Sequence, residues 1–236
     1  YDKWKASEGK PVPKKIEPLP WDPKSLKNMN YLRAMLAVDK SVGNIRECLE
    51  KQEILDQTVF VFASDNGYFI GAHQRGDKRL MYEESLRIPL MIRYPEMIEA
   101  GTSNQEMVLN IDVAPTLLEL AGTSVPAEMQ GASLVSLLQN DPVEWRESIM
   151  YEYFQEAYAP GFVTVAGVRN KRYKYIESPY LQEDINELYD LQSDPGEMDN
   201  QINNPDYEEI RSEMKAELER LKAATGYNDP QIYIDN

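Results

Sequence analysis

A short strand that ends in a cluster of oxygen-bearing side chains constrains this sequence more than any other feature. Residues 58–63 are β-branched, aromatic or small, which is typical of a buried strand too short to be a helix. The strand stops at Ser64-Asp65-Asn66-Gly67. Ligands collect outside the carboxyl ends of strands in open α/β sheets, and adjacent carboxylate and amide oxygens suit Ca²⁺ or Mg²⁺. The stretch therefore predicts an α/β domain with a cation site at this strand end.

The residues that follow favour a functional loop over a simple turn. Taken alone, consecutive Asp, Asn and Gly residues are explained most simply as an Asx turn closed by glycine. Here a loop follows with glycines at positions 71 and 76, and it carries the only histidine of the sequence, His73. Lys78 and Arg79 lie in the same loop, and Tyr82 and Glu83 come shortly after them.

The composition excludes nucleic acid as a partner and excludes a membrane span. The chain has 40 acidic and 25 basic residues and a net charge of −15, whereas nucleic-acid-binding domains are basic. It contains no run of about 18 apolar residues. The single cysteine, Cys48, excludes an internal disulfide and is expected in the core. The chain begins without Met or a signal-peptide pattern, so we interpret it as a fragment or a processed piece.

Two local patches are basic although the chain is acidic. Residues 75–93 hold five basic and three acidic side chains, and residues 169–174 hold four basic side chains and no acidic one. Screening at physiological salt acts over about 8 Å, so the local charge matters more to a bound ligand than the total charge. Each patch is therefore expected to be able to hold an anion.

The first part of the chain predicts an extended arm followed by helices and strands. The density of proline over residues 1–27 predicts the arm. Apolar residues at spacings of three and four predict a helix from about residue 25 to 51, which leads into the strand at Thr58. Such helix–strand units are typical of layered α/β domains. The elements expected downstream are a strand at 88–95, a short strand at 107–110, a helix capped by Asp112 and stopped by Gly122, and a short helix at 132–138.

After about residue 146 the pattern changes to short aromatic and β-branched segments separated by turns. Residues 149–154, 163–168, 173–176 and 187–191 predict an antiparallel sheet. Apolar residues at helical spacing between positions 207 and 221 predict an amphipathic helix that lies on this sheet.

Together these motifs resemble the second half of a type I sulfatase, a family of the alkaline-phosphatase-like superfamily. The resemblance spans most of residues 31–221 and rests on Ser64-Asp-Asn-Gly67, Lys78, Tyr82-Glu83, Arg87-Ile-Pro-Leu90, Asp112-Val-Ala-Pro-Thr-Leu117, Tyr173-Lys-Tyr175 and the segment from Glu187 to Glu197. It implies an α/β fold class. Residues 1–145 would form the C-terminal part of the sandwich, a mixed sheet flanked by helices. Residues 146–236 would form a small α+β subdomain with an antiparallel sheet and a packed C-terminal helix.

The resemblance implies a pair of metal ligands and a catalytic lysine. Asp65 and Asn66 match two ligands of the family's active-site Ca²⁺, which would neutralise sulfate oxygens as a Lewis acid. Lys78 matches the lysine that contacts the sulfate and stabilises charge on the leaving oxygen. Without the flanking motifs, Lys78 would be interpreted as a solvated surface lysine.

His73 and Arg79 are the candidate substrate contacts. His73 is either a solvated loop residue or a hydrogen-bonding or orienting group in the sulfate pocket. Arg79 either binds a sugar substituent or pairs with Glu83 across one helical turn. Residues 77–79 and the Tyr-Glu pair that follows resemble the sulfatase branch that acts on 6-O-sulfated N-acetylglucosamine in glycosaminoglycans. A sulfated sugar is therefore the expected substrate.

The nucleophile of the family is missing from this sequence. The family oxidises a residue of a Cys-x-Pro-Ser-Arg type motif to formylglycine, and no such motif occurs here, since Cys48 is followed by Leu49 and Glu50. Two further calcium carboxylates are missing, as is the family's upstream histidine proton donor, because no histidine precedes His73. The chain is therefore expected to supply half of an active site, to need Ca²⁺ ligands from outside it, and to be inactive alone.

Three functions stay open at this point. The first is the C-terminal part of a sulfatase, whose partners would be a sulfated carbohydrate and the N-terminal half of the same protein. The second is a phosphomonoester or phosphonate hydrolase of the same superfamily, and the third is a non-catalytic module that binds anions or carbohydrate. The family usually acts outside the cytoplasm, and the absence of Asn-x-Ser/Thr sequons favours a bacterial periplasmic or secreted protein.

Overall fold

The computed structural model describes residues 25–156, 162–179 and 185–228. Most of the arm expected at residues 1–27 lies outside the described residues. Among the helices that are described, none combines the length and the apolar character needed to cross a lipid bilayer.

The described residues form two compact units, and each is considered by itself. The first unit contains residues 25–65 and 88–145, and the second contains residues 66–87 and the described residues from 146 onward. The loop that carries Lys78 thus belongs to the same unit as the C-terminal segments. The domain division after residue 145 stays a prediction.

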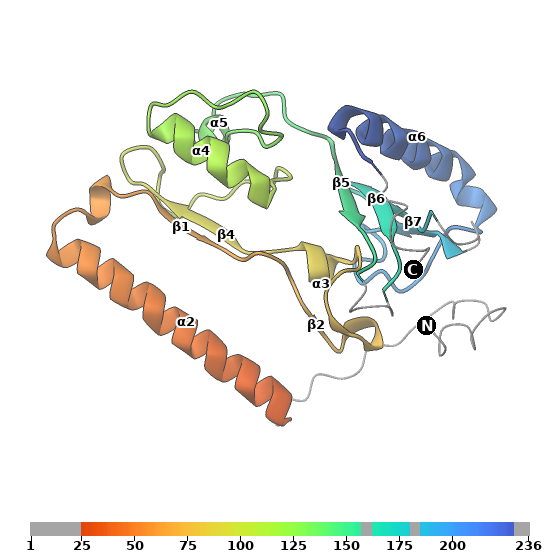
Figure 1. Ribbon diagram of the computed structural model, residues 1–236, viewed down its shortest axis with the longest axis horizontal. Helices are drawn as coiled ribbons and strands as arrows, with labels where there is room; N and C mark the ends of the chain where they lie inside the picture. The colour runs from red at the N-terminus through yellow and green to blue at the C-terminus, as the bar shows by residue number, and fades with distance from the viewer. Residues whose placement is uncertain (1–24, 157–161, 180–184, 229–236) are drawn as a thin grey trace. The chain divides into compact units, whose positions relative to one another are not determined.

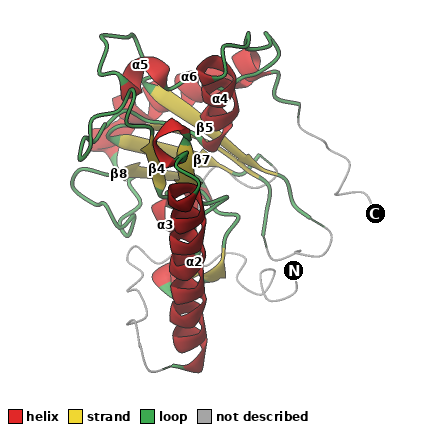
Figure 2. Ribbon diagram, turned by 90° about the vertical axis from the view of Figure 1, so that its left-hand side faces the viewer, coloured by secondary structure: helices red, strands yellow, loops and turns green. Residues whose placement is uncertain are grey.

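A long helix and a two-stranded ribbon frame the first unit (Figure 1). Helix α2 spans Leu26–Lys51 and stands out by its length in Figure 2. The hydroxyl oxygen of Ser25 accepts a hydrogen bond from Asn28 N at 3.2 Å and so satisfies an amide of the first turn. After the 3₁₀ turn η1 (Leu55–Gln57), strand β1 (Phe60–Ala63) pairs antiparallel with β4 (Leu90–Arg93). The predicted helix and both strands are confirmed. Strand β1 is half-buried, less than expected, because β4 is its one paired neighbour among the described strands.

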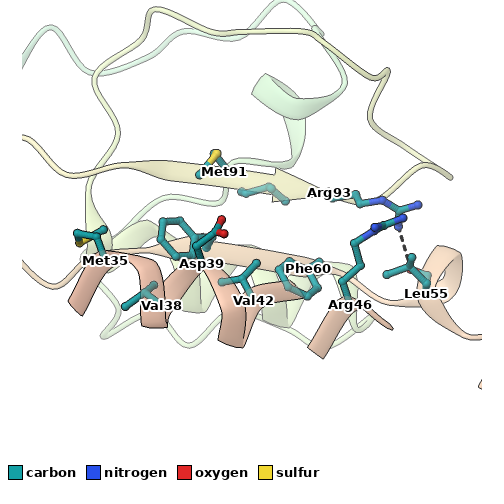
Figure 3. A pocket seen from close by; sticks show the side chains of 11 residues that line it. Met35, Val38, Asp39, Val42, Arg46, Leu55, Phe60, Met91 and Arg93 are labelled. Atoms are coloured by element: carbon teal, nitrogen blue, oxygen red, sulfur yellow. Dashed lines mark hydrogen bonds between the residues drawn. The ribbon is translucent and has the colours of Figure 1, made fainter. Parts of the chain in front are cut away.

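Helix α2 and the ribbon enclose a groove of about 390 Å³ (Figure 3). Its lining is mainly apolar and includes Met35, Val38 and Val42 of α2 and Phe60 and Met91 of the strands. Other apolar side chains of α2 are largely exposed, with Leu36 at 70% and Ile45 at 54% of their surface. Cys48 is also exposed, so its predicted place in the core is wrong. Nothing in the described part of the chain covers this stretch of α2.

Two short helices complete the first unit. Helix α4 (Val113–Leu120) and helix α5 (Val135–Leu138) follow the 3₁₀ turn η3 (Asn110–Asp112). Both helices are confirmed, but the strand predicted at 107–110 is wrong. The buried carboxylate of Asp112 explains this, since it accepts hydrogen bonds from Leu109 N at 2.7 Å and Ala132 N at 2.8 Å and bends the chain there. Its side chain therefore does not cap α4, contrary to the prediction. Gly122, at a φ of 70°, ends that helix as expected.

A four-stranded antiparallel sheet and one helix dominate the second unit. The strands are β5 (Ser148–Tyr153), β6 (Val165–Asn170), β7 (Tyr173–Glu177) and β8 (Glu187–Asp190), in the order β5-β6-β7-β8. Helix α6 (Glu208–Thr225), after the 3₁₀ turn η5 (Pro205–Tyr207), packs Met214 and Leu218 against Val168, Tyr175 and Leu188 of the sheet. The antiparallel sheet and the helix on it are confirmed.

The loop with the candidate site residues is built from very short elements. These are β2 (Phe69–Ile70), the 3₁₀ turn η2 (Ala72–Gln74), β3 (Gly76–Asp77) and the one-turn helix α3 (Glu83–Leu86). Strands β2 and β3 pair antiparallel, with Phe69 opposite Asp77. Lys78 follows β3 directly and is separated from α3 by four residues.

Candidate active site

Asn66 and Lys78 are joined by a direct hydrogen bond. Lys78 Nζ donates to Asn66 Oδ1 at 2.6 Å, and Asn66 Nδ2 donates to Gly67 O at 2.7 Å. The second bond fixes the orientation of the Asn66 amide, so that its carbonyl oxygen faces the ammonium of Lys78. Lys78 is half-buried, which differs from a freely solvated surface lysine. Asp65 precedes Asn66 in the chain, belongs to the first unit and is exposed.

Asp77 and Arg79 flank Lys78 and are bonded to each other. Asp77 Oδ1 accepts a hydrogen bond from Lys78 N at 2.7 Å and also forms an ion pair with Arg79 Nη1. Arg79 Nε donates to Glu156 Oε2 at 2.7 Å. The pairing of Arg79 with Glu83 that helical spacing suggested is wrong, because a backbone at positive φ directs Arg79 towards Glu156 instead.

His73 is buried, so its interpretation as a solvated loop residue is wrong. Its side chain is 5% exposed and stacks on Tyr82 with ring centroids 4.1 Å apart. His73 Nε2 lies 3.4 Å from Glu84 Oε2. Burial opposes the ionisation of Glu84, but His73, the backbone amide of Glu84 and Lys174 together lower the pKa of that carboxyl. His73 thus holds the loop against the start of α3.

Glu83 is the centre of four charged side chains, which we call the buried ion cluster: Glu83, Arg169, Lys174 and Glu197. Arg169 contacts both carboxylate oxygens of Glu83, at 2.9 and 3.1 Å. Lys174 Nζ lies 2.8 Å from Glu83 Oε1 and 2.6 Å from Glu197 Oε1. Glu197 Oε2 accepts a hydrogen bond from Glu83 N at 2.7 Å.

This cluster corrects the second basic patch expected from the sequence. Arg169 and Lys174 are neutralised by the cluster, and Arg172 pairs with Asp190 at 2.9 Å. Lys174 has no exposed surface. Residues 169–174 therefore do not form an anion-binding surface. Their charges instead attach β6 and β7 to α3 and to β8.

The two carboxylates that share the Lys174 ammonium have different surroundings, which set their pKa values apart. Burial opposes the ionisation of Glu83, but hydrogen bonds from Arg169 and the charge of Lys174 lower the pKa of its carboxyl. Burial raises the pKa of Glu197 to about 7, and Lys174 offsets only part of that effect. Glu197 is therefore the member of the cluster that exchanges a proton near neutral pH.

This difference predicts how stability depends on pH. Since the pKa of Glu197 is raised in the folded state from a usual value of 4.5 to about 7, the folded state binds that proton more tightly. The stabilisation is fully present below pH 4.5 and is lost as the pH rises through 7, a change on the order of 3 kcal/mol. Urea unfolding at pH 5 and pH 7.5 should show it, and Glu197→Gln should remove it. An identical pH dependence in both proteins would contradict the assignment.

His73, Glu84 and Glu197 also form a group with the donor types of a metal site. One donor atom of each residue lies within 4.8 Å of the other two. His73 Nε2, Glu84 Oε2 and Glu197 Oε1 are buried and have no hydrogen bond of good geometry among the described residues. However, the ammonium of Lys174 is 2.6 Å from the Glu197 donor and already supplies positive charge there. We therefore interpret the group as part of the packing around the buried ion cluster.

Two residues of the buried ion cluster, Lys174 and Glu197, could not be identified from the sequence. They lie in segments that the family resemblance includes but to which it assigns no role in the site. Lys174 is the central residue of Tyr173-Lys-Tyr175, and Glu197 ends the Asp-Pro-Gly-Glu turn after β8. Both were expected to belong to the C-terminal subdomain alone. The only signal available was that a lysine sits in a strand between two aromatic residues, where burial demands an acidic partner.

Comparisons with known proteins show the family to which this chain is related. Residues 71–224 match the family described as N-sulphoglucosamine sulphohydrolase, C-terminal. An N-acetylglucosamine-6-O-sulfatase of Bacteroides thetaiotaomicron is 39% identical over 204 residues, which is 85% of this chain and 36% of that protein. A solved structure, described as in complex with its substrate D-glucosamine-2-N,6-O-disulfate, superposes with a TM-score of 0.80 at 39% identity and covers 85% of this chain and 41% of that one. The phosphonate monoester hydrolase of Agrobacterium radiobacter superposes with a TM-score of 0.71 at 28% identity, over 80% of this chain and 39% of that one.

These matches confirm the expected α/β fold class, because solved sulfatases share the architecture. The chain spans a little over a third of the length of its curated relatives, at 36% and 37% for the first two. The family match itself extends over more than half of the chain. The chain therefore belongs to the N-sulphoglucosamine sulphohydrolase C-terminal family of sulfatases.

Proposed function

We propose that this chain is the C-terminal part of an enzyme that hydrolyses sulfate esters of a sulfated sugar or glycosaminoglycan, including glucosamine 6-O-sulfate. The observation that carries the proposal is the half-buried Lys78 ammonium held 2.6 Å from the carbonyl oxygen of Asn66, beside Asp65 in the chain. This places an ammonium next to the side-chain oxygen of Asn66, one of the two expected metal ligands. An anionic ester needs both kinds of group.

Lys78 would act on the ester through its ammonium protons. Nζ can donate to a sulfate oxygen and to the leaving sugar oxygen, where negative charge grows as the S–O bond breaks. Asn66 Oδ1 accepts one hydrogen bond from Nζ and so directs the remaining N–H groups of the ammonium. The hydrogen bond from Lys78 N to Asp77 fixes the backbone from which the side chain extends.

Asp65 and Asn66 would hold the Ca²⁺ that the family implies. Their donors fit this ion, since both are hard oxygens and the bond from Nδ2 to Gly67 O leaves the carbonyl oxygen of Asn66, not its NH₂ group, to act as the ligand. When bound, the ion would supply Lewis-acid neutralisation of the sulfate oxygens. Two ligands are fewer than the six to eight oxygens that Ca²⁺ takes, so further ligands and the formylglycine nucleophile would come from outside this chain.

Arg79 and His73 would contribute to the sugar side of the site. Arg79 is half-buried and held between Asp77 and Glu156, which gives its guanidinium a fixed direction. A fixed guanidinium can recognise a sugar hydroxyl or a second sulfate. His73, buried against Tyr82, would act mainly by orienting the loop.

Two observations support a contribution from a further part of the protein. The chain spans about a third of its relatives, and much of the apolar surface of α2 is exposed. We therefore propose that the N-terminal half of the same protein packs on the first unit. We also propose that the whole protein acts outside the cytoplasm, in the periplasm or after secretion, as the family usually does.

The isolated 236-residue chain is expected to bind Ca²⁺ weakly, because it supplies two identified ligands of a larger set. Calorimetric titration with CaCl₂, with MgCl₂ as a control, measures this. A dissociation constant below micromolar would show that the chain holds a nearly complete site and would contradict the proposed sharing.

The function is tested with the complete protein that carries this chain. Sulfate release from glucosamine 6-O-sulfate in Ca²⁺, and its loss in a chelator, is the expected result. A phosphonate monoester is the matched alternative substrate, because a phosphonate monoester hydrolase has the same fold at a TM-score of 0.71. Faster turnover of the phosphonate would support that second function. Binding of sulfated sugar without turnover of either ester would identify a carbohydrate-binding module.

A further inference from the structure

The backbone on both sides of Lys78 adopts a conformation that L-residues rarely take. Asp77 has a φ of 90° and Arg79 a φ of 85°. Of the seven non-glycine residues at positive φ in the described ranges, four lie between positions 73 and 79. Such conformations cost on the order of 1–3 kcal/mol each and persist only where the surroundings enforce them. The turn that presents Lys78 must therefore be held by contacts outside it.

The segment after this turn is anchored to the C-terminal sheet at consecutive residues. Met81 is 1% exposed and fills the space that Gly167 of β6 leaves, where a Cβ would lie 2.2 Å from the Met81 sulfur. The hydroxyl of Tyr82 donates to Glu187 Oε2 at 2.6 Å. Burial and the Glu187 carboxylate raise the pKa of Tyr82 well above its usual range, so the phenol stays a proton donor.

Glu83, the first residue of α3, is held through both its side chain and its backbone. The side-chain carboxylate forms an ion pair with the ammonium of Lys174, and the backbone amide donates a hydrogen bond to Glu197. Lys174 in turn contacts Glu197. A closed triangle of contacts thus joins the start of α3 to β7 and to the turn after β8. Glu197 itself has a φ of 52°, so the triangle also stabilises a second strained residue.

We propose that Lys174 and Glu197 are positioning residues for Lys78. The proposal rests on the proposed function, because the place of Lys78 matters to catalysis only if it contacts the ester. Lys174 and Glu197 are 0% and 2% exposed, so neither can touch a substrate. By fixing the start of α3 they hold the strained turn at residues 77–79, and with it the contact of Lys78 with Asn66. A displacement of about 1 Å at a catalytic group can cost up to 100-fold in rate.

The test is Lys174→Met in the complete sulfatase that carries this chain. Methionine fills a similar volume without charge, and Glu83 keeps Arg169 as a partner. We expect kcat to fall by about 10- to 100-fold with KM changed less than about threefold, because Glu156 still holds Arg79, the proposed sugar contact. Hydrogen exchange should accelerate at the amides of residues 78–85.

A conservative pair at Glu197 separates positioning from charge. Glu197→Gln keeps an oxygen that accepts from Glu83 N, and we expect it to retain kcat within about threefold. Glu197→Leu removes the acceptor and is expected to behave like Lys174→Met. This pair also carries the test if Lys174→Met does not fold. Equal kcat values for Gln and Leu would overturn the proposal.

Lys222→Met is the matched control. Lys222 lies on α6 and forms ion pairs with Glu177 of β7 and with Glu219. The substitution therefore removes an ion pair from the same sheet at a residue whose two ion pairs do not involve α3. Exchange at residues 78–85 and kcat should stay unchanged in it. Loss of kcat in both lysine variants, with exchange raised throughout β6 and β7, would indicate general destabilisation and overturn the proposal. Exchange does not depend on turnover, so an inactive parent protein would refute the proposed function while the exchange data still test the positioning.

Discussion

Replacing Lys78 with alanine is expected to lower kcat on sulfate esters by a factor of about 100 or more in the complete enzyme. The ammonium is half-buried and held 2.6 Å from Asn66, so its charge is directed rather than averaged over solvent. Loss of one such donor removes stabilisation that grows as the leaving oxygen gains charge. The fall should therefore lie mainly in kcat, with a smaller rise in KM.

Two variants control this measurement. Lys51→Ala removes a lysine that is 72% exposed on α2 and pairs with Glu47 within the helix, and it should leave the rate unchanged. Lys78→Arg keeps the charge but not the compact ammonium, and it should recover part of the rate. An unchanged kcat in Lys78→Ala, with folding intact, would remove Lys78 from the chemistry.

The order of elements could be predicted from the sequence because each is specified locally. Helix α2, strands β1 and β4, and the sheet with α6 follow from residues a few positions apart, and all were confirmed. The strand expected at 107–110 was wrong because a distant contact bends the chain there. The Asp112 carboxylate accepts a hydrogen bond from the backbone amide of Ala132, 20 positions further along the chain. Cys48 failed for a related reason, since an amphipathic stripe shows which face could be buried but not whether anything covers it.

The candidate site could be predicted only for residues that lie within recognisable sequence motifs. The Asp-Asn pair was identified from its place at a strand end and Lys78 from the family resemblance, and the structure brings Asn66 and Lys78 together. The partners of Glu83 could not be found in this way, because Arg169 lies 86 positions away and Glu197 lies 114 positions away. The four basic residues between positions 169 and 174 therefore suggested an anion-binding patch, although Arg169 and Lys174 neutralise acids from distant segments.

Gly67 gives the second large effect, since it is the point where the turn that follows Asn66 meets α3. Gly67 N donates to Ser85 O at 2.8 Å, and a Cβ at position 67 would lie 2.0 Å from Glu84 O and 2.9 Å from Glu84 C. These are backbone atoms, so no side-chain rotation can relieve the overlap. Gly67→Ala must therefore displace α3 or the turn that carries Asn66.

We expect Gly67→Ala to lower the free energy of unfolding by about 3 kcal/mol and to lower kcat at least tenfold, because α3 also anchors the Lys78 turn. Urea unfolding and initial rates measure the two effects. Gly43→Ala is the matched control, because a Cβ at Gly43 of α2 meets nothing within 4 Å, and alanine there should stabilise the helix by about 0.5–1 kcal/mol. If Gly67→Ala unfolded at the same urea concentration as the parent protein, the close approach of the turn to α3 would be refuted. The link from Asn66 through α3 to Lys78 would then have to run through the hydrogen bond between the two side chains alone.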